Sequence, residues 1–149
     1  MILPIVAYGD PVLRKVAEDL DKDYEGLDEL IDNMYQSMYA AKGVGLAAPQ
    51  IGRSIRLFVI DSEAMMEPEE KGKGLKEVFI NAQILDETGS EFDFEEGCLS
   101  IPGIREDVRR PETVTIEYYD QNWNMHVKTF EGMTARVIQH EYDHIEGIL

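Results

Sequence analysis

The stretch Gln139–Gly147, which reads QHEYDHIEG, decides how the rest of the chain is organised. Its two histidines, His140 and His144, are four residues apart, so on a helix they project from the same face and can reach one metal ion. Glu141 lies one step further round the helix, where it can accept a proton from water on that ion. The pattern His-Glu-x-x-His on a helix is typical of metal-dependent hydrolases. Two histidines do not complete such a site, so other residues must supply the rest.

A catalytic zinc-type site uses three protein ligands and leaves one position for water. In the longer form of the helix pattern, a third histidine would fall beyond residue 149, and no ligand follows far downstream of His144. We therefore expect the third ligand upstream, where Cys98 and His126 are the soft candidates. Cys98 is favoured because a thiolate binds zinc-like metals strongly and follows Gly97 in a strand-exit loop. His126 lies on a predicted hairpin strand, which favours a surface or packing role, and a carboxylate ligand also remains open.

Composition fits one globular domain over residues 1–149. The chain is 44% hydrophobic and 30% charged, which is ordinary for a soluble protein. Thirty acidic and 14 basic residues give a net charge of −16, which argues against broad binding to nucleic acid or to an anionic membrane. We expect no membrane partner and no direct sequence-specific binding to nucleic acid. No apolar run is long enough to span a bilayer. The only cysteine, Cys98, cannot form an intrachain disulfide, which suits a reducing cytosol, so we expect a cytoplasmic protein.

The hydrophobic pattern predicts an α+β fold, because strands and helices do not alternate regularly. Apolar residues at helical spacing predict a helix over about 24–41, and Asp10 followed by Pro11 predicts a short helix to about Asp19. A last helix is predicted from about Met133 to Glu146. Residues 61–76 are predicted to form an exposed loop, and Pro102–Gly103 a turn. Strands are predicted at 55–60, 78–85, 91–95, 113–119 and 125–130.

The stretch at residues 43–50, which reads GVGLAAPQ, has two glycines and several small residues at the exit of the predicted long helix. Small residues let a backbone approach another group closely. One interpretation is a tight connection that needs glycine for its dihedral angles. The other is a wall of a substrate cleft, with Gln50 offering its amide. The pattern alone favours neither.

Three stretches together resemble the signature motifs of the peptide deformylase family. They are residues 43–50 (GVGLAAPQ), 96–100 (EGCLS) and 139–144 (QHEYDH), in the family's order and with similar separations, and residues 10–14 (DPVLR) are similar too. The resemblance implies mixed and antiparallel β-sheets packed around a central metal-binding helix. It also implies a metal-dependent hydrolase, of bacterial or organellar type, that removes the formyl group from the formyl-methionine of newly made polypeptides and releases formate.

By motif position, the resemblance implies that Cys98, His140 and His144 are the metal ligands. It implies ferrous iron as the native metal, which zinc, nickel or cobalt can replace. Family members usually continue past the last motif, and in some a C-terminal helix contacts the ribosome. Because this sequence stops at Leu149, we expect a C-terminal tail that is short or absent and at most a transient contact with the ribosome.

The same resemblance assigns the remaining roles. Glu141 carries the proton from water to the leaving amine, and the developing oxyanion is held by the amide of Gln50 and the backbone N–H of Leu99. The residues implied to bind or frame the substrate are Gly43, Val44, Gly45, Glu96, Gly97, Arg105, Met133 and Val137.

Two other kinds of protein remain as alternatives. A metallopeptidase would share the helix motif but would not need Cys98 as a ligand. An inactive metal-binding or interaction protein on the same fold would need neither Glu141 nor Gln50.

Overall fold

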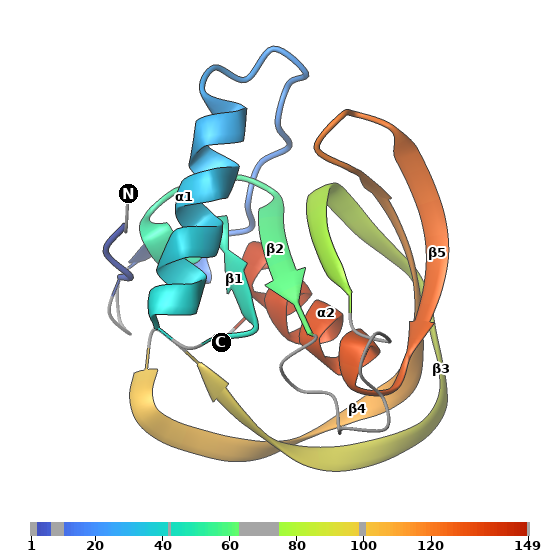
Figure 1. Ribbon diagram of the computed structural model, residues 1–149. Helices are drawn as coiled ribbons and strands as arrows, with labels where there is room; N and C mark the ends of the chain where they lie inside the picture. The colour runs from blue at the N-terminus through green and yellow to red at the C-terminus, as the bar shows by residue number, and fades with distance from the viewer. Residues whose placement is uncertain (1–2, 7–10, 42, 63–74, 99–100, 149) are drawn as a thin grey trace.

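The computed structural model describes residues 3–6, 11–41, 43–62, 75–98 and 101–148, and of residues 90–98 and 101–110 it describes the backbone path but not the side chains. Helices and strands combine in one α+β fold, as predicted (Figure 1). The elements in order are η1 (Pro11–Arg14), α1 (Leu27–Ala40), β1 (Gly45–Ala47), η2 (Ala48–Ile51), β2 (Leu57–Asp61), β3 (Lys76–Cys98), β4 (Ile101–Tyr119), β5 (Met125–Glu131) and α2 (Gly132–Ile145). Among the described residues, no helix is both long enough and apolar enough to cross a membrane.

The five strands form one antiparallel sheet in the order β1-β2-β3-β4-β5. The strands β3 and β4 make a long hairpin, which sweeps beneath both helices in Figure 1. Four register shifts interrupt their pairing. Because an extra residue on one strand bends and twists a β-ribbon, these shifts allow the hairpin to curve rather than extend as a flat ribbon.

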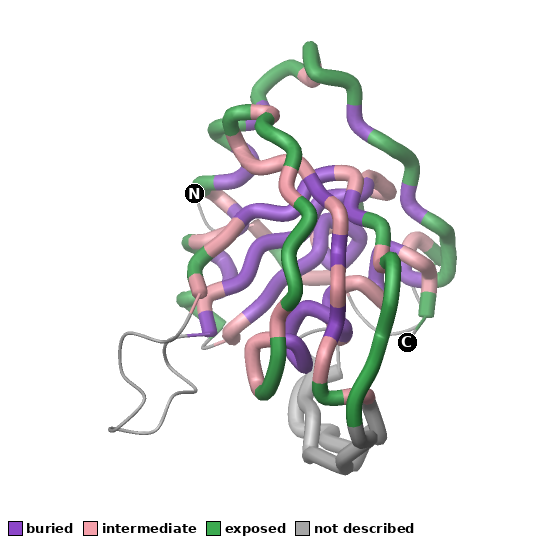
Figure 2. Tube along the Cα trace, turned by 90° about the vertical axis from the view of Figure 1, so that its right-hand side faces the viewer, coloured by how far each residue is buried: buried purple, intermediate pink, exposed green. Residues whose placement is uncertain are grey.

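The strand β2 separates two hydrophobic clusters. Phe58 and Ile60 belong to the cluster that includes residues of α2, and Leu57 and Val59 belong to the cluster that includes residues of α1. Successive side chains of a strand point to opposite faces, so α1 and α2 cover opposite faces of the sheet here. All four side chains are fully buried, which explains why this strand is a continuous apolar run. Buried residues gather in the centre of the molecule (Figure 2).

The predicted long helix is confirmed as α1. It begins at Leu27 because Gly26 before it has the left-handed backbone conformation, with φ of 75°. The predicted helix that extends to Asp19 is wrong, since only the short 3-10 helix η1 forms. Beyond η1, the backbone instead makes hydrogen bonds with distant segments. The N–H of Ala17 donates to the carbonyl of Ile145 at 2.8 Å, and the N–H of Glu18 donates to the carbonyl of Ser54 at 3.0 Å.

Every predicted strand is present, with different limits. The predicted strands at 78–85 and 91–95 are both parts of β3, and the strand predicted at 113–119 is the end of β4. Residues 63–74 of the predicted loop lie outside the described residues. The turn predicted at Pro102–Gly103 is wrong, because both residues lie in β4. Gly97 pairs with Arg105 and Cys98 with Ile101, so residues 102–104 are extra residues opposite a continuous strand, and such a bulge tolerates proline and glycine.

Candidate active site

The helix α2 carries the sequence motif, as predicted. The rings of His140 and His144 lie with their centroids 5.1 Å apart and their planes at 75°. His144 and Glu141 are almost completely buried, with 3% and 4% of their surfaces exposed, and His140 is half-buried. Two imidazoles and a buried carboxylate therefore lie together on the side of α2 that faces the protein interior. Imidazole nitrogens suit zinc, iron and nickel ions, so these donors fit a divalent metal of that class.

Gly45 lies directly against Glu141. A Cβ atom placed on Gly45 would be 2.7 Å from Oε2 of Glu141 and 2.8 Å from its Cγ. Real side chains do not approach so closely, so glycine is required here for the strand β1 to touch the helix α2. The small residues at 43–50 were expected to let the backbone come close to another group. At Gly45 that group is the carboxylate of Glu141.

The strand β1 presents backbone groups at the edge of the sheet. The N–H of Asp61 donates to the carbonyl of Val44 at 2.8 Å, and in an antiparallel pair the direction of these groups alternates from residue to residue. The N–H and carbonyl groups of Gly45 and Ala47 therefore point away from β2. Accordingly, the N–H of Ala47 donates to Oε1 of the Gln50 side chain at 3.0 Å.

The contact with Ala47 also orients the Gln50 carboxamide. Gln50 is 1% exposed and lies in η2, directly after β1. Because Oε1 accepts the hydrogen bond from Ala47, the other end of the carboxamide is the NH2 group, which is a donor. The structure thus brings Gln50, Gly45 and Glu141 into one continuous arrangement of β1, η2 and α2.

The end of the β3–β4 hairpin contains the second motif. Glu96, Gly97 and Cys98 are the last residues of β3, and Gly97 pairs with Arg105. The side chains of Glu96, Cys98 and Arg105 lie outside the described residues, and so does all of Leu99. Within the part of the chain whose side chains are described, no group of three His, Cys, Asp or Glu residues could hold an ion. The role of Cys98 as third ligand therefore stays a prediction.

The residues predicted to frame the substrate fall into two places. Gly43 and Val44 form the connection between α1 and β1, where the N–H of Gly43 donates to the carbonyl of Met38 at 2.9 Å. Met133 and Val137 lie on α2, seven and three residues before His140. Val137 is 4% exposed and belongs to the hydrophobic cluster beneath α2, whereas Met133 is half-buried. Their part in a methionine pocket stays a prediction.

His126, the alternative third ligand, is held within the β4–β5 hairpin. Its Nε2 lies 2.8 Å from Oδ2 of Asp120, and its ring stacks on Tyr118 with the centroids 5.2 Å apart. The hydrogen bond from His126 is the main cause that lowers the pKa of the Asp120 carboxyl below its ordinary value. These contacts are those of a packing residue, the role that the sequence favoured for His126.

One residue near α2 has no place in the sequence-based prediction. Arg56, directly before β2, is 4% exposed, and its Nη2 donates to the carbonyl of Ala82 at 2.8 Å and to Oε1 of Glu146 at 3.0 Å. The sequence offered one signal for this role: Arg56 is a charged residue directly before the continuous apolar strand at residues 57–60. Its partner Glu146 lies two residues after His144, which links Arg56 to the end of the motif helix.

Comparisons with known proteins identify the family to which this fold belongs. Residues 2–149 match the family model described as "Polypeptide deformylase". The chain is 59% identical over 156 aligned residues to the peptide deformylase of Christiangramia forsetii, an alignment that covers 100% of this chain and 80% of that protein. The crystal structure of peptide deformylase from Thermotoga maritima has a TM-score of 0.89 and 39% identity, and the match covers 100% of this chain and 95% of that chain. A Met-Ala-Ser-bound class I type b peptide deformylase from Acinetobacter baumannii has a TM-score of 0.88 and 32% identity, with 100% and 96% covered. The chain therefore belongs to the polypeptide deformylase family.

Proposed function

We propose that the buried carboxylate of Glu141, seated against Gly45, is the proton carrier with which this chain removes the N-formyl group from newly made polypeptides. Members of the family are metal-dependent enzymes that hydrolyse this formyl amide, and this chain is such an enzyme. The observation that carries the residue assignment is the contact itself, with Oε2 2.7 Å from a Cβ built on Gly45. The carboxylate thus lies beside β1, where the backbone groups of Gly45 point away from β2.

We further propose that His140, His144 and Cys98 hold the metal. The two imidazoles lie together on α2, and a thiolate completes a nitrogen and sulfur donor set that suits ferrous iron as well as zinc, nickel or cobalt. Ferrous iron is proposed as the native ion and the others as substitutes. When bound, the ion polarises the formyl carbonyl and activates water near neutral pH.

The chain's own residues complete the reaction. Glu141 accepts a proton from the attacking water and donates it to the nitrogen of methionine as the bond between carbon and nitrogen breaks, so formate and a free amine leave. The NH2 group of Gln50 and the backbone N–H of Leu99 donate to the oxygen of the formyl group as negative charge develops there. The orientation of the Gln50 carboxamide, fixed by Ala47, supports its part in this step.

Substrate recognition is proposed to use the outer edge of β1. A peptide that adds as a strand there binds through its backbone, in hydrogen bonds with Gly45. Recognition through backbone groups is independent of sequence, which suits nascent polypeptides that share only their first residue. The methionine side chain then faces α2, where Met133 and Val137 form an apolar wall. The Acinetobacter baumannii relative bound to Met-Ala-Ser supports a peptide that begins with methionine.

The other proposed contacts lie at the two ends of this peptide site. Gly43 and Val44 frame it where α1 joins β1, while Glu96 and Gly97 do so from the end of β3. Arg105, which pairs with Gly97 across the hairpin, is proposed at the rim of the pocket. We also propose that residues 1–149 form a single catalytic domain.

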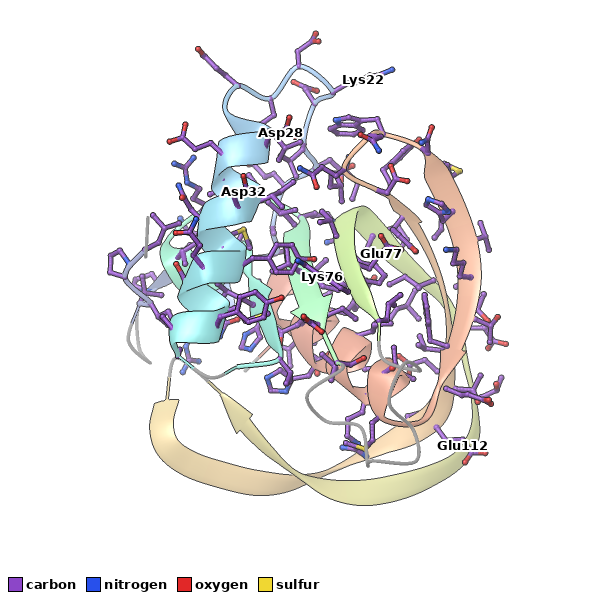
Figure 3. The ribbon with its side chains drawn as sticks, in the orientation of Figure 1. Lys22, Asp28, Asp32, Lys76, Glu77 and Glu112 are labelled. Atoms are coloured by element: carbon purple, nitrogen blue, oxygen red, sulfur yellow. The ribbon has the colours of Figure 1, made fainter. Side chains whose placement is uncertain are left out.

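Such substrates place the enzyme in the cytoplasm, where bacterial polypeptides are made, and we propose that it acts there. Acidic side chains are spread over the surface: Asp28 and Asp32 lie along α1, and Glu112 lies at the lower right of the molecule (Figure 3). With a net charge of −16, repulsion from ribosomal RNA opposes lasting attachment. The proposed contact with the ribosome is therefore transient.

The decisive experiment is an assay of formate release from formyl-Met-Ala-Ser by protein purified without oxygen, combined with elemental analysis of bound metal. We expect formate release and about one metal ion per chain. Unformylated peptides of the same sequence serve as the control, and their cleavage would indicate a metallopeptidase instead. Protein that holds the metal but releases no formate would contradict the proposed function and favour an inactive binding protein.

A further inference from the structure

The last turn of α2, which carries His144, is held from outside the active site by a buried cation. We propose that Arg56 is a positioning residue that fixes this turn and thereby the separation of the two metal-binding histidines. The inference rests on the proposed function, since it concerns the same metal site. The chemistry described above makes no use of Arg56, although it is 4% exposed, and buried charges require partners.

The guanidinium group of Arg56 connects the sheet to the helix. Its Nη2 donates both to the carbonyl of Ala82 on β3, at 2.8 Å, and to Oε1 of Glu146 after the end of α2, at 3.0 Å. Its central carbon lies 5.6 Å from the ring centroid of Tyr142. Asp19, the remaining carboxylate, is 3.8 Å from Nε and 70% exposed, so it is a weaker partner. Tyr142 and Glu146 flank His144, two residues on either side.

The N-terminal arm holds the same turn from a second direction. The N–H of Ala17 donates to the carbonyl of Ile145 at 2.8 Å, and a Cβ on Gly147 would lie 2.7 Å from the carbonyl oxygen of Arg14. Arg56 fixes this arm as well, because its own N–H donates to the carbonyl of Glu18 at 2.7 Å. The side chain and the backbone of Arg56 thus join three segments at the end of α2.

These contacts act on His144 rather than on the whole helix. The turns of α2 before His144 are packed into the core through Ala135 and Ile138, and Ile145 in the last turn is fully buried as well. The Arg56 contacts add to this packing only in the last turn, at Tyr142 and Glu146. Loss of the Arg56 contacts should therefore move the last turn, with His144, relative to His140. Donors of a metal site must stay within about 0.5 Å of their productive positions. A cation at the C-terminal end of a helix also stabilises the helix dipole, which favours this turn in its present place.

The test measures how fast nickel leaves the loaded full-length enzyme in excess EDTA, together with kcat and KM for formyl-Met-Ala-Ser. The variant Arg56→Met removes both hydrogen bonds, and we expect nickel release to be about tenfold faster, as for residues that support metal ligands from behind. Arg53→Met is the matched control: Arg53 is exposed, and its Nη1 donates to the hydroxyl of Tyr24 at 2.9 Å rather than to α2. Its nickel release should equal that of the wild type. Arg56→Lys should restore part of the retention.

A second pair of variants separates positioning from general destabilisation. Glu146→Gln keeps a hydrogen-bond acceptor but removes the negative charge. It should speed nickel release by roughly threefold, less than the roughly 10- to 100-fold effects of losing such a partner altogether. Leu30→Ala weakens the core under α1, on the other face of the sheet, and should leave nickel release unchanged at temperatures where the variant stays folded. If Leu30→Ala released nickel as fast as Arg56→Met, or if Arg56→Met and Glu146→Gln both retained it like the wild type, the inference would be overturned. A wild-type enzyme that held no nickel and released no formate would overturn the proposed function instead.

Discussion

Replacing Gly45 by alanine tests the contact on which the active-site assignment depends. Gly45 does not have a positive φ, so its backbone conformation accepts alanine without strain. The only change is a methyl group directed at Glu141. That methyl carbon would lie 2.7 Å from Oε2, 2.8 Å from Cγ and 2.9 Å from Cδ.

The size of the effect follows from these distances. Ordinary van der Waals contact begins at 3.4 Å, so Oε2 must retreat by about 0.7 Å, the difference between 3.4 and 2.7 Å. Catalytic groups tolerate displacements of about 0.5 Å, and a misplacement of about 1 Å costs on the order of 100-fold. We expect kcat to fall roughly 30- to 100-fold, which corresponds to about 2–2.7 kcal/mol of transition-state stabilisation. Crowding at this buried position should also destabilise the fold by roughly 1–3 kcal/mol.

The assay is formate release from formyl-Met-Ala-Ser, with metal content and thermal unfolding measured on the same samples. Metal content should stay near the wild-type value, because the three atoms nearest the added methyl group all belong to Glu141. In a Glu141→Ala background the methyl group meets no carboxylate, so adding Gly45→Ala should have little further effect on turnover. A Gly45→Ala enzyme with wild-type kcat would refute the reasoning, and so would a full additional loss in the Glu141→Ala background.

Four further outcomes are expected. Glu141→Ala should retain the metal and lose roughly 10²- to 10⁴-fold in kcat; near-normal turnover would remove Glu141 as the proton carrier. Gln50→Ala should lower kcat by roughly 10²- to 10³-fold through loss of an oxyanion donor, and an effect on KM alone would contradict that role. Cys98→Ser should weaken metal retention by roughly 100-fold or more, since effects of 10- to 100-fold are seen even for outer partners; full metal content after dialysis would rule out Cys98 as a ligand. Asp120→Asn should lower Tm at neutral pH by roughly 1–4 °C. Because the hydrogen bond from His126 lowers the pKa of Asp120, the stabilisation by this pair is present above about pH 4 and is lost as the pH falls through the folded-state pKa. The Tm difference should therefore shrink as the pH falls below about 4, and a difference that stayed constant there would contradict the reasoning.

The sequence predicted the motif helix well because its signal is local. The spacing of His140 and His144 and the apolar residues of α2 report on one helix and one face, and the structure has both. The strand β2 was equally clear, since its run of apolar residues is buried on both sides. In each case the local sequence pattern and the long-range packing favour the same backbone conformation.

Predictions were wrong where distant segments decide the backbone. Asp10 and Pro11 are good residues to start a helix, yet the segment after η1 exchanges hydrogen bonds with the end of α2 and with Ser54. Pro102 and Gly103 are good turn residues, yet they lie in β4. There the pairing moves four residues along β4, from Ile101 to Arg105, but only one residue along β3, from Cys98 to Gly97. The contact of Gly45 with Glu141 could not be predicted either, since it joins residues 96 positions apart, from Gly45 to Glu141. Only the presence of glycine indicated that something comes close.

The helix α2 is thus restrained at two points that act on different atoms. On the face toward β1, Gly45 sets how far the carboxylate of Glu141 can move. At the C-terminal end, Arg56 holds the turn that contains His144. Proton transfer depends on the first restraint and metal retention on the second, so damage to them should be separable. A change at Gly45 should lower turnover in enzyme that keeps its metal, whereas a change at Arg56 should release metal from enzyme whose remaining loaded fraction turns over normally. If both changes lowered turnover and metal content in the same proportion, the two contacts would act on the same property of the site, and the proposed separation would be wrong.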